Sequence, residues 1–181
     1  MSTQIAEKTT YAIDPAHSSA EFVVRHLMIT KVRGSFTGLA GTIDIDGDSD
    51  VPSAVRARIE ASTIDTREPQ RDTHLKSADF FEVEKFPALE FVSTRIEGAP
   101  RDFTIHGNLT IHGVTRDIAL KAEFEGRGAD PWGGQRIGYS AFATISRKDF
   151  GLTWNAALET GGVAVGDEVR IELNVQAVLQ K

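Results

Sequence analysis

The sequence contains no cysteine among its 181 residues, and this absence excludes several chemistries at once. Disulfide bonds, thiolate nucleophiles and cysteine-ligated zinc are all ruled out. The chain also lacks a G-x-S-x-G nucleophile pattern, a phosphate-binding loop and a dinucleotide fingerprint. Its carboxylates are plentiful, but none is marked out as an acid/base pair. We therefore predict that the chain is not an enzyme and has no catalytic residues.

The chain also lacks an excess of positive charge and long apolar runs. The formal net charge of -6 disfavours a nucleic-acid partner. No dense Lys/Arg block is present that would hold the chain on an anionic membrane, and no apolar run approaches the length of a membrane span. The first residues, MSTQIAEKTTYAID, lack the apolar segment of a secretory signal. We expect a soluble, cytoplasmic protein without an integral membrane segment.

The chain does contain a series of stretches that are apolar on one face only. Phe103, Ile105, Leu109 and Ile111 alternate with polar residues, and the same period of two recurs along the chain. The predicted strands are 18–27, 31–45, 54–61, 88–97, 101–112, 115–126, 135–147 and 167–179. With no long helix among them, they indicate an all-β fold in which one antiparallel sheet closes into an eight-stranded barrel. We predict one domain over residues 1–181, with residues 1–10 flexible.

Two long connections interrupt this series, 64–87 and 152–165. The first is predicted to hold a short helix with Asp72 as its N-cap. In the second, residues 154–158 are predicted to form one helical turn. The strand over 31–45 is expected to bend at Gly38 and Gly41, where glycine permits a kink.

The inward-facing residues mix large and small side chains. The small ones leave space, which favours an apolar ligand cavity; the alternative is that they only relieve crowding where strands cross. They are Ala20, Ala57, Gly107, Ala122, Ala141, Ala143 and Ala177.

Nine short strings, in one order along the chain, resemble the YceI-like family of polyisoprenoid-binding, lipocalin-like barrel proteins. The strings are IDPAHS (13–18), FVVRHLM (22–28), KVRGSF (31–36), STIDT (62–66), RDTHLKSADFF (71–81), KFP (85–87), GNLTIHGVT (107–115), SRKDFGL (146–152) and VGDEV (165–169). The resemblance covers residues 11–179. It implies a lipocalin-like barrel with a tunnel for a long isoprenoid, such as a quinone tail or a polyprenyl phosphate.

The function predicted from this resemblance is binding of a long-chain isoprenoid lipid for carriage, storage or sequestration. No metal and no cofactor other than this lipid ligand is expected. The resemblance makes a homodimer plausible, and many relatives carry a secretory leader that is not visible here. The predicted wall is Phe22, Val24, Phe91, Phe103, Leu120, Tyr139 and Ala141. The predicted polar end is His26, Arg71 and His74.

Several polar residues have two interpretations. His26 shares a face with Phe22 and Val24, so it is either a hydrogen-bond donor to a head group or a core histidine satisfied by a backbone carbonyl. The charges of 71–76 are either a lid facing a head group or internal ion pairs of a loop, and the second is favoured. Arg147 is assigned to the barrel rim, and His106 and His112 are expected to face solvent.

Two other functions stay open from the residues alone. One is an enzyme whose site at the barrel mouth uses His17, His26 or His74 with Asp72, with or without a metal. The other is a structural or stress-response protein with a packed core and no small-molecule ligand.

Overall fold

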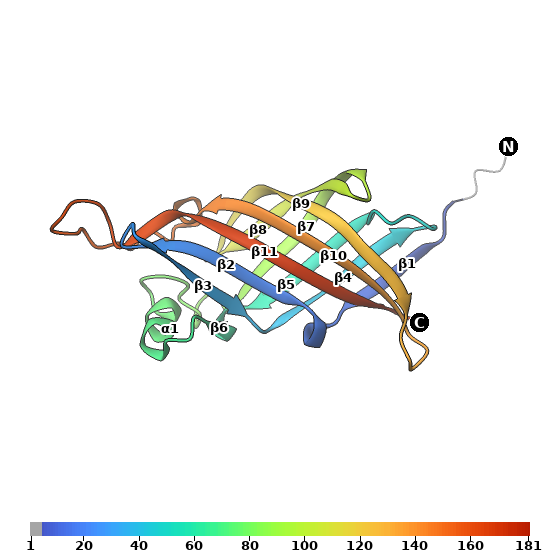
Figure 1. Cartoon of the computed structure of the whole chain (residues 1–181), viewed down its shortest axis with the longest axis horizontal. Coiled ribbons are helices and arrows are strands. Elements are labelled where there is room, and N and C mark those ends of the chain that lie inside the picture. Colours follow the sequence, from blue (N-terminus) through green and yellow to red (C-terminus); the bar gives the residue numbers. More distant parts are fainter. Residues whose placement is uncertain (1–4) are drawn as a thin grey trace.

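The computed structural model describes residues 5–181, which form a long, tapered β-barrel with one α-helix beside it (Figure 1). The strands are β1 (Lys8–Ile13), β2 (Ser19–His26), β3 (Thr30–Phe36), β4 (Leu39–Asp46), β5 (Ala54–Glu60), β6 (Ile64–Asp65), β7 (Ala88–Ala99), β8 (Asp102–Ile111), β9 (Val114–Ala129), β10 (Gln135–Ser146) and β11 (Val165–Leu179). The helix is α1 (Pro69–Lys76), and the 3₁₀ turns are η1 (Pro15–His17), η2 (Ala61–Thr63) and η3 (Arg147–Phe150).

The sheet closes into a barrel because β1 and β2 together occupy one strand position and β3 and β4 together occupy the next. β11 pairs with β2 along its first part and with β1 at its end. β3 pairs with β2, and β4 pairs with β1. From β4 the sheet runs through β5, β7, β8, β9 and β10 back to β11, all antiparallel. This is a closed eight-stranded antiparallel barrel, which confirms the predicted fold class.

Two strands were absent from the sequence prediction, the two-residue β6 and the longer β1. β1 begins with Lys8, Thr9 and Thr10, and it buries only Tyr11 and Ile13. Its polar start hides the period of two, although β1 supplies the closing pairs to β4 and β11. Of the segment 1–10 predicted to be flexible, residues 8–10 belong to β1 and residues 1–4 lie outside the described part of the chain.

The predicted strand over 31–45 is broken at Thr37 and Gly38, between β3 and β4. Gly38 lies beside Thr63, whose hydroxyl accepts a hydrogen bond from the Gly38 N–H. Gly41 does not bend the chain but lies inside β4. A Cβ there would collide with the carbonyl oxygen of Arg56, so glycine lets β4 and β5 approach closely.

Both predicted helical features of the connections need correction. α1 begins one turn earlier than predicted, because Glu68 is its N-cap and accepts from the N–H groups of Gln70 and Arg71. Asp72 lies inside the first turn instead. Residues 154–158 form no helical turn, because Asn155 exchanges two hydrogen bonds with the backbone of Val165 and keeps this segment extended.

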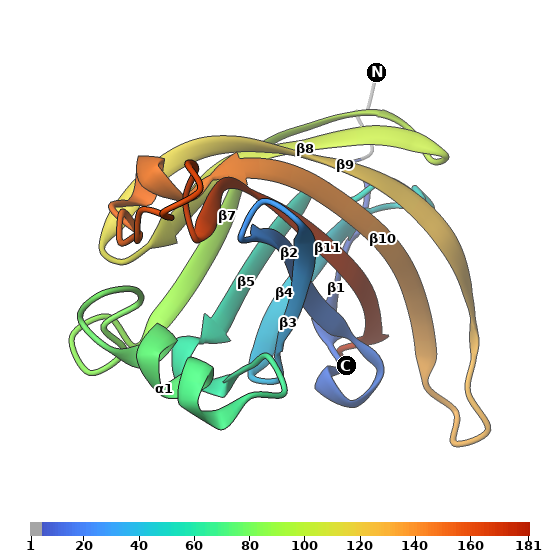
Figure 2. The same ribbon diagram turned by 60° about the vertical axis from the view of Figure 1, so that its left-hand side comes forward.

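The barrel has two ends that differ in construction (Figures 1 and 2). The α1 end carries α1, the β2–β3 turn (27–29) and the β10–β11 loop (151–164). The C-terminal end carries the β4–β5 loop (47–53), the β9–β10 loop (130–134) and the C terminus. Among residues 5–181, no helix combines the length and apolar character that a bilayer span requires.

Candidate functional site

The interior of the barrel contains an apolar cavity of about 230 Å³. Its wall comes from the inward faces of the strands, and its α1 end is covered by the β6–β7 connection (residues 66–87). A water molecule needs only about 10–15 Å³ of such space, so the cavity is large enough for part of an organic ligand. This confirms the predicted cavity and contradicts a fully packed core.

Six of the seven residues predicted as wall line this cavity: Phe22, Val24, Phe91, Leu120, Tyr139 and Ala141. The seventh, Phe103, is almost fully buried and lies behind the lining, where its ring meets Tyr139 edge to face at 5.9 Å. Whether these residues contact a ligand stays a prediction.

The small inward residues serve two purposes. Ala20, Ala57, Ala122 and Ala141 line the cavity and create its space. Gly107 has another role, because the ring of Phe91 lies where its Cβ would be. Ala143 and Ala177 are buried outside the lining. Relief of crowding therefore explains Gly107, whereas the four lining alanines make the cavity.

Aromatic contacts hold the β6–β7 connection against the barrel. Phe81 meets Phe36 edge to face at 5.9 Å, and Phe36 lies 5.7 Å from Phe22 on β2. Leu75 and Phe80 of the same connection also line the cavity. The connection is thus part of the cavity wall.

A second aromatic cluster joins this connection to the β10–β11 loop. The ring of His74 lies 4.7 Å from Trp154 and 5.1 Å from Phe80, and Trp154 lies 5.4 Å from Phe80. His74 Nε2 is 2.8 Å from a carboxylate oxygen of Asp79. The two loops that cover the α1 end are therefore in direct contact.

The three residues predicted for the polar end lie outside the cavity lining. His26 is exposed at the last position of β2, so its expected place in the interior is wrong. Arg71 is turned back on its own loop, where it donates to the hydroxyl and the carbonyl oxygen of Thr66. Asp72 accepts from the same threonine. Arg71 and Asp72 thus bind Thr66 rather than forming the predicted ion pairs, and a head-group role for His26, Arg71 and His74 stays a prediction.

The cationic side chain that borders the cavity is Arg147, which is 4 % exposed. Its guanidinium donates to four backbone carbonyl oxygens, and the donor–acceptor distances are 2.6 Å to Leu152, 2.9 Å to Trp154, 2.8 Å to Gly166 and 3.3 Å to Val165. Burial lowers the pKa of Arg147, and Asp167 opposes this effect from 3.7 Å. Arg147 therefore fixes the β10–β11 loop at the barrel rim, as expected.

The acidic residues that border the cavity are directed to its outside. Glu90 pairs with Arg58 at 2.6 Å, and Glu21 lies 4.0 Å from Arg33, both arginines being exposed. At the C-terminal end, Tyr139 satisfies its hydroxyl by donating to the carbonyl oxygen of Asp50 at 2.8 Å, and burial raises the pKa of Tyr139. The cavity thus presents carbon atoms to an occupant and few free polar groups.

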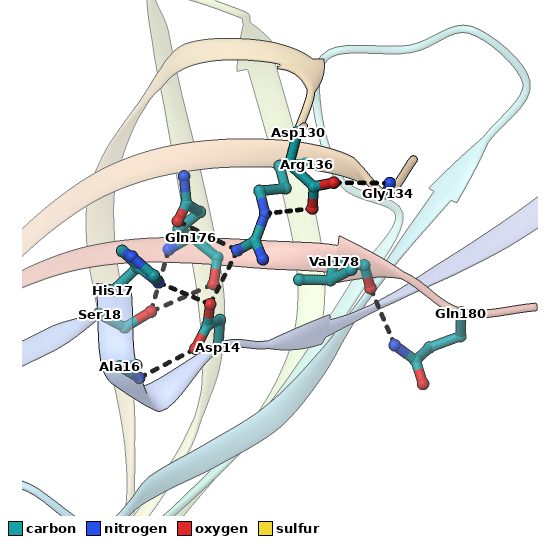
Figure 3. A network of polar contacts seen from close by, with 10 residues as sticks. All are labelled: Asp14, Ala16, His17, Ser18, Asp130, Gly134, Arg136, Gln176, Val178 and Gln180. Atoms are coloured by element: carbon teal, nitrogen blue, oxygen red, sulfur yellow. Dashed lines mark hydrogen bonds and ion pairs between the residues drawn. The ribbon is translucent and has the colours of Figure 1, made fainter. Parts of the chain in front are cut away.

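A polar network on the outside of the barrel involves His17 (Figure 3). Arg136 donates to Asp14 and Asp130, each at 2.8 Å, and His17 Nδ1 lies 2.8 Å from Asp14. The hydrogen bond from Arg136, with a smaller contribution from His17, lowers the pKa of Asp14 to about 2. This network joins η1 to the β9–β10 loop and is structural.

The residues of the enzyme hypothesis are not brought together. His17 and His26 are separated by the length of β2, in which each residue spans roughly 3.3 Å. His74 of α1 lies within hydrogen-bond distance of Asp79, which follows the helix, and Asp72 accepts a hydrogen bond from the Thr66 hydroxyl. Within residues 5–181 no group of three His, Cys, Asp or Glu side chains is placed to hold a metal ion.

His112 was expected to face solvent, but it packs in the β8–β9 turn with its ring 4.8 Å from Phe86. Its Nε2 is buried, makes no hydrogen bond within the described residues, and lies 3.5 Å from a carboxylate oxygen of Glu82. Phe86 therefore packs on this turn and is not part of the cavity lining.

Comparison with known proteins assigns this chain to a family. The model of the YceI-like domain matches residues 11–177. The chain belongs to the YceI-like family. Among its relatives, a UPF0312 protein of Staphylococcus aureus is 37% identical over 171 residues, covering 93% of this chain and 96% of the relative. Protein YceI of Salmonella newport is 35% identical over 181 residues, covering 99% and 92%.

Solved structures show the same barrel. The YceI protein of Campylobacter jejuni superimposes with a TM-score of 0.74 at 30% identity, covering 87% of this chain and 90% of that one. BcnA of Burkholderia cenocepacia gives 0.78 at 20% identity, covering 91% and 99%. A polyisoprenoid binding domain from Saccharophagus degradans gives 0.66 at 15% identity, covering 98% and 100%. At these lower identities the likeness concerns the YceI-like fold alone.

Sequence reasoning missed two parts of the YceI-like cavity. The first is Ile13 of β1, whose strand begins with polar residues. The second is the pair of Leu152, near the start of the β10–β11 loop, and Val165, directly after it, both of which line the cavity. A signal was present for the second group, because each of these apolar residues lies beside a glycine at a loop boundary.

Proposed function

We propose that this YceI-like protein binds a long-chain isoprenoid lipid, of the polyprenyl phosphate or isoprenoid quinone type, with its tail in the barrel cavity. The observation that carries this proposal is the wall itself, in which aliphatic and aromatic side chains from the strands and the β6–β7 connection enclose the space. The likeness to a polyisoprenoid binding domain supports it at the level of the fold. Carriage, storage or sequestration of the lipid would each follow from such binding.

The tail supplies the binding energy in this proposal. Each CH₂ group that moves from water into the cavity contributes about 0.8 kcal/mol, before the cost of ordering the chain is subtracted. Arg147 is already engaged with backbone carbonyls, so it offers little to a charged head group. We therefore expect affinity to rise with the number of isoprene units and to depend weakly on the head group.

The test uses protein that is stripped of lipid by organic extraction in denaturant and then refolded. Binding of a polyprenyl phosphate, an isoprenoid quinone and a shorter prenol is measured by native mass spectrometry and by saturation with radiolabelled ligand. We expect saturable uptake of one lipid per chain and weaker uptake of the shorter prenol. No saturable binding of any of the three would refute the proposal.

Ala141→Trp is the decisive variant because Ala141 lies in the cavity wall, opposite Leu173 and Ala122 in the neighbouring strands. An indole there would fill space that the tail needs, so uptake should fall at least tenfold. Ala119→Trp is the matched control, because Ala119 is exposed on the outside of β9. Equal uptake by both variants would place the ligand elsewhere.

A further inference from the structure

The turn between β2 and β3 exposes two large apolar side chains. Met28 is 50 % and Ile29 is 77 % exposed, at the tip of a hairpin on the α1 end. The Ile29 N–H donates to the carbonyl oxygen of His26 at 3.1 Å, which closes a tight turn around Leu27 and Met28. Exposed side chains of this size lower solubility and do nothing for the core of this barrel.

The backbone of the same turn is strained. Leu27 has φ 53° and Met28 has φ 63°, in the left-handed region that side chains disfavour. A turn with two such positions is normally built from Asn-Gly, which adopts them at low cost. The sequence has Leu and Met at these positions instead. The tip therefore combines an unfavourable backbone conformation with exposed apolar side chains. Strain of this kind is typical of functional positions.

The neighbouring β10–β11 loop holds this tip in place. The Leu27 N–H donates to the carbonyl oxygen of Ala164 at 2.8 Å. Gly162 of the same loop approaches Met28, since a Cβ at Gly162 would lie 3.4 Å from Met28 Cγ. Figure 2 shows the turn and the loop projecting from the same end of the barrel. The tip is therefore a fixed projection.

The hairpin segment that carries the tip is positively charged, whereas the whole chain is acidic. Arg25, His26, Lys31 and Arg33 flank it, and residues 22–43 contain no acidic residue, although the net charge is -6. Arg33 is compensated by Glu172 at 3.1 Å. Arg25 and Lys31 are exposed and form no ion pair with any residue in the range 5–181. Acidic residues also lie near the tip, because Asp167 and Glu168 belong to the irregular part of β11 opposite Arg25, and Asp167 is engaged by Arg147 and Lys148.

We propose that the β2–β3 tip docks this protein on an anionic lipid bilayer. Met28 and Ile29 would enter the boundary between head groups and acyl chains, while Arg25 and Lys31 face the anionic head groups. A narrow convex tip with flanking cations fits a bilayer surface better than a protein partner, which needs a broad complementary face. Two exposed cations without a carboxylate partner, of which Arg25 also donates to the carbonyl oxygen of Met28, and two apolar side chains give weak and reversible attachment.

The tip lies close to the cavity along β2. Val24 lines the cavity two residues before His26, and His26 pairs with Val165, another lining residue. Docking would thus bring the α1 end of the cavity to the membrane surface. The inference gives the proposed lipid binding a source of ligand, but it can be tested on protein without any ligand.

The test is co-sedimentation with vesicles of phosphatidylcholine containing 30 mol% phosphatidylglycerol, compared with pure phosphatidylcholine, at low salt and at 0.5 M NaCl. We expect binding to the anionic vesicles at low salt, and its loss in pure phosphatidylcholine or at high salt. Lys31→Gln should weaken binding about fivefold. Absence of binding to anionic vesicles at low salt would overturn the proposal and would favour a protein partner for the tip.

Met28→Gly separates docking from a structural role. Glycine relieves the strain at φ 63°, so the thermal midpoint should rise, while vesicle binding should fall about fivefold or more because the methionine side chain is lost. Trp132→Ser is the matched control, because Trp132 is 85 % exposed at the opposite end, and this variant should bind vesicles like the parent. Unchanged binding by Met28→Gly, or an equal loss with Trp132→Ser, would refute docking by this tip.

Discussion

Phe103, Ile45 and Ile137 are each 1 % exposed at the C-terminal end, whereas Val24 and Phe81 at the α1 end are only half-buried and face the cavity. The first end is closed by the barrel strands themselves and by a polar network outside them. The second is closed by two loops that meet through His74, Phe80 and Trp154. The α1 end also contains fully buried side chains, such as Phe150 of η3 at 1 % exposed, so the two ends differ in what closes them: strands at the first, and contacts between loops at the second.

The largest effect should come from Phe103→Ala at the C-terminal end. Removal of this buried ring should lower the free energy of unfolding by about 3–5 kcal/mol. Phe22→Ala should cost roughly half as much, because the Phe22 ring already borders empty space and loses fewer contacts. Chemical denaturation of both variants measures the difference. Equal losses would show that the cavity wall is packed as tightly as the closed end.

Arg147→Met should have the next largest effect, at the α1 end. It removes the donor shared by the carbonyl oxygens of Leu152, Trp154 and Gly166, and buried acceptors without partners should cost about 2 kcal/mol. Hydrogen exchange in residues 151–166 should accelerate in parallel. Lys148→Met is the control, since Lys148 is exposed and pairs only with Asp167. If the two variants behave alike, Arg147 does not fix the loop.

The sequence predicted the regular strands better than the connections at the α1 end, and the reason is physical. Strands β8 and β11 display the period of two because one face is buried and the other is solvated. Contacts at the α1 end depend on partners that a residue pattern does not specify. Arg147 is held by backbone carbonyls, and Glu68 rather than Asp72 caps α1 because of where the chain turns before the helix.

Residue type alone also failed to separate cavity from core. Ala122, Ala141, Ala143 and Ala177 share the same inward register, yet only the first two line the cavity. Whether an alanine lines the cavity depends on the size of the side chains across the barrel at the same height. Those neighbours are set by the closure of the sheet, which a residue pattern does not reveal. β1 could not be predicted because its first three residues are polar and only Tyr11 and Ile13 are buried, so it shows too little of the period of two.

Trp154→Ala sharpens the comparison through dynamics. Loss of its contacts to His74 and Phe80 should cost only about 1 kcal/mol in global stability, because such aromatic pairs contribute about 0.5–1.5 kcal/mol each and Trp154 is half-buried. Hydrogen exchange in residues 66–87 should nevertheless accelerate severalfold. Trp132→Ala at the other end should change neither quantity. Unchanged exchange in Trp154→Ala would mean that the two loops close the cavity independently.

The smallest effect concerns the polar network at the C-terminal end and depends on pH. Arg136, assisted by His17, lowers the pKa of Asp14 from 3.8 to about 2, so the folded state holds the carboxylate in its charged form. A carboxyl group with a lowered pKa stabilises the folded state fully above its unfolded pKa, and this contribution disappears as the pH falls from about 4 towards 2.

Asp14→Asn should therefore lower the thermal midpoint by an amount that is constant between pH 5 and 7 and shrinks below pH 4. Because the side chains of this network are only partly buried and solvent screens them, it contributes about 1 kcal/mol, which is a few degrees for a chain of this size. Asp48→Asn, an exposed loop residue, is the control. If the difference between Asp14→Asn and the parent stays constant down to pH 2, the charge of Asp14 does not stabilise the C-terminal end, and its closure rests on the buried residues Phe103, Ile45 and Ile137 alone.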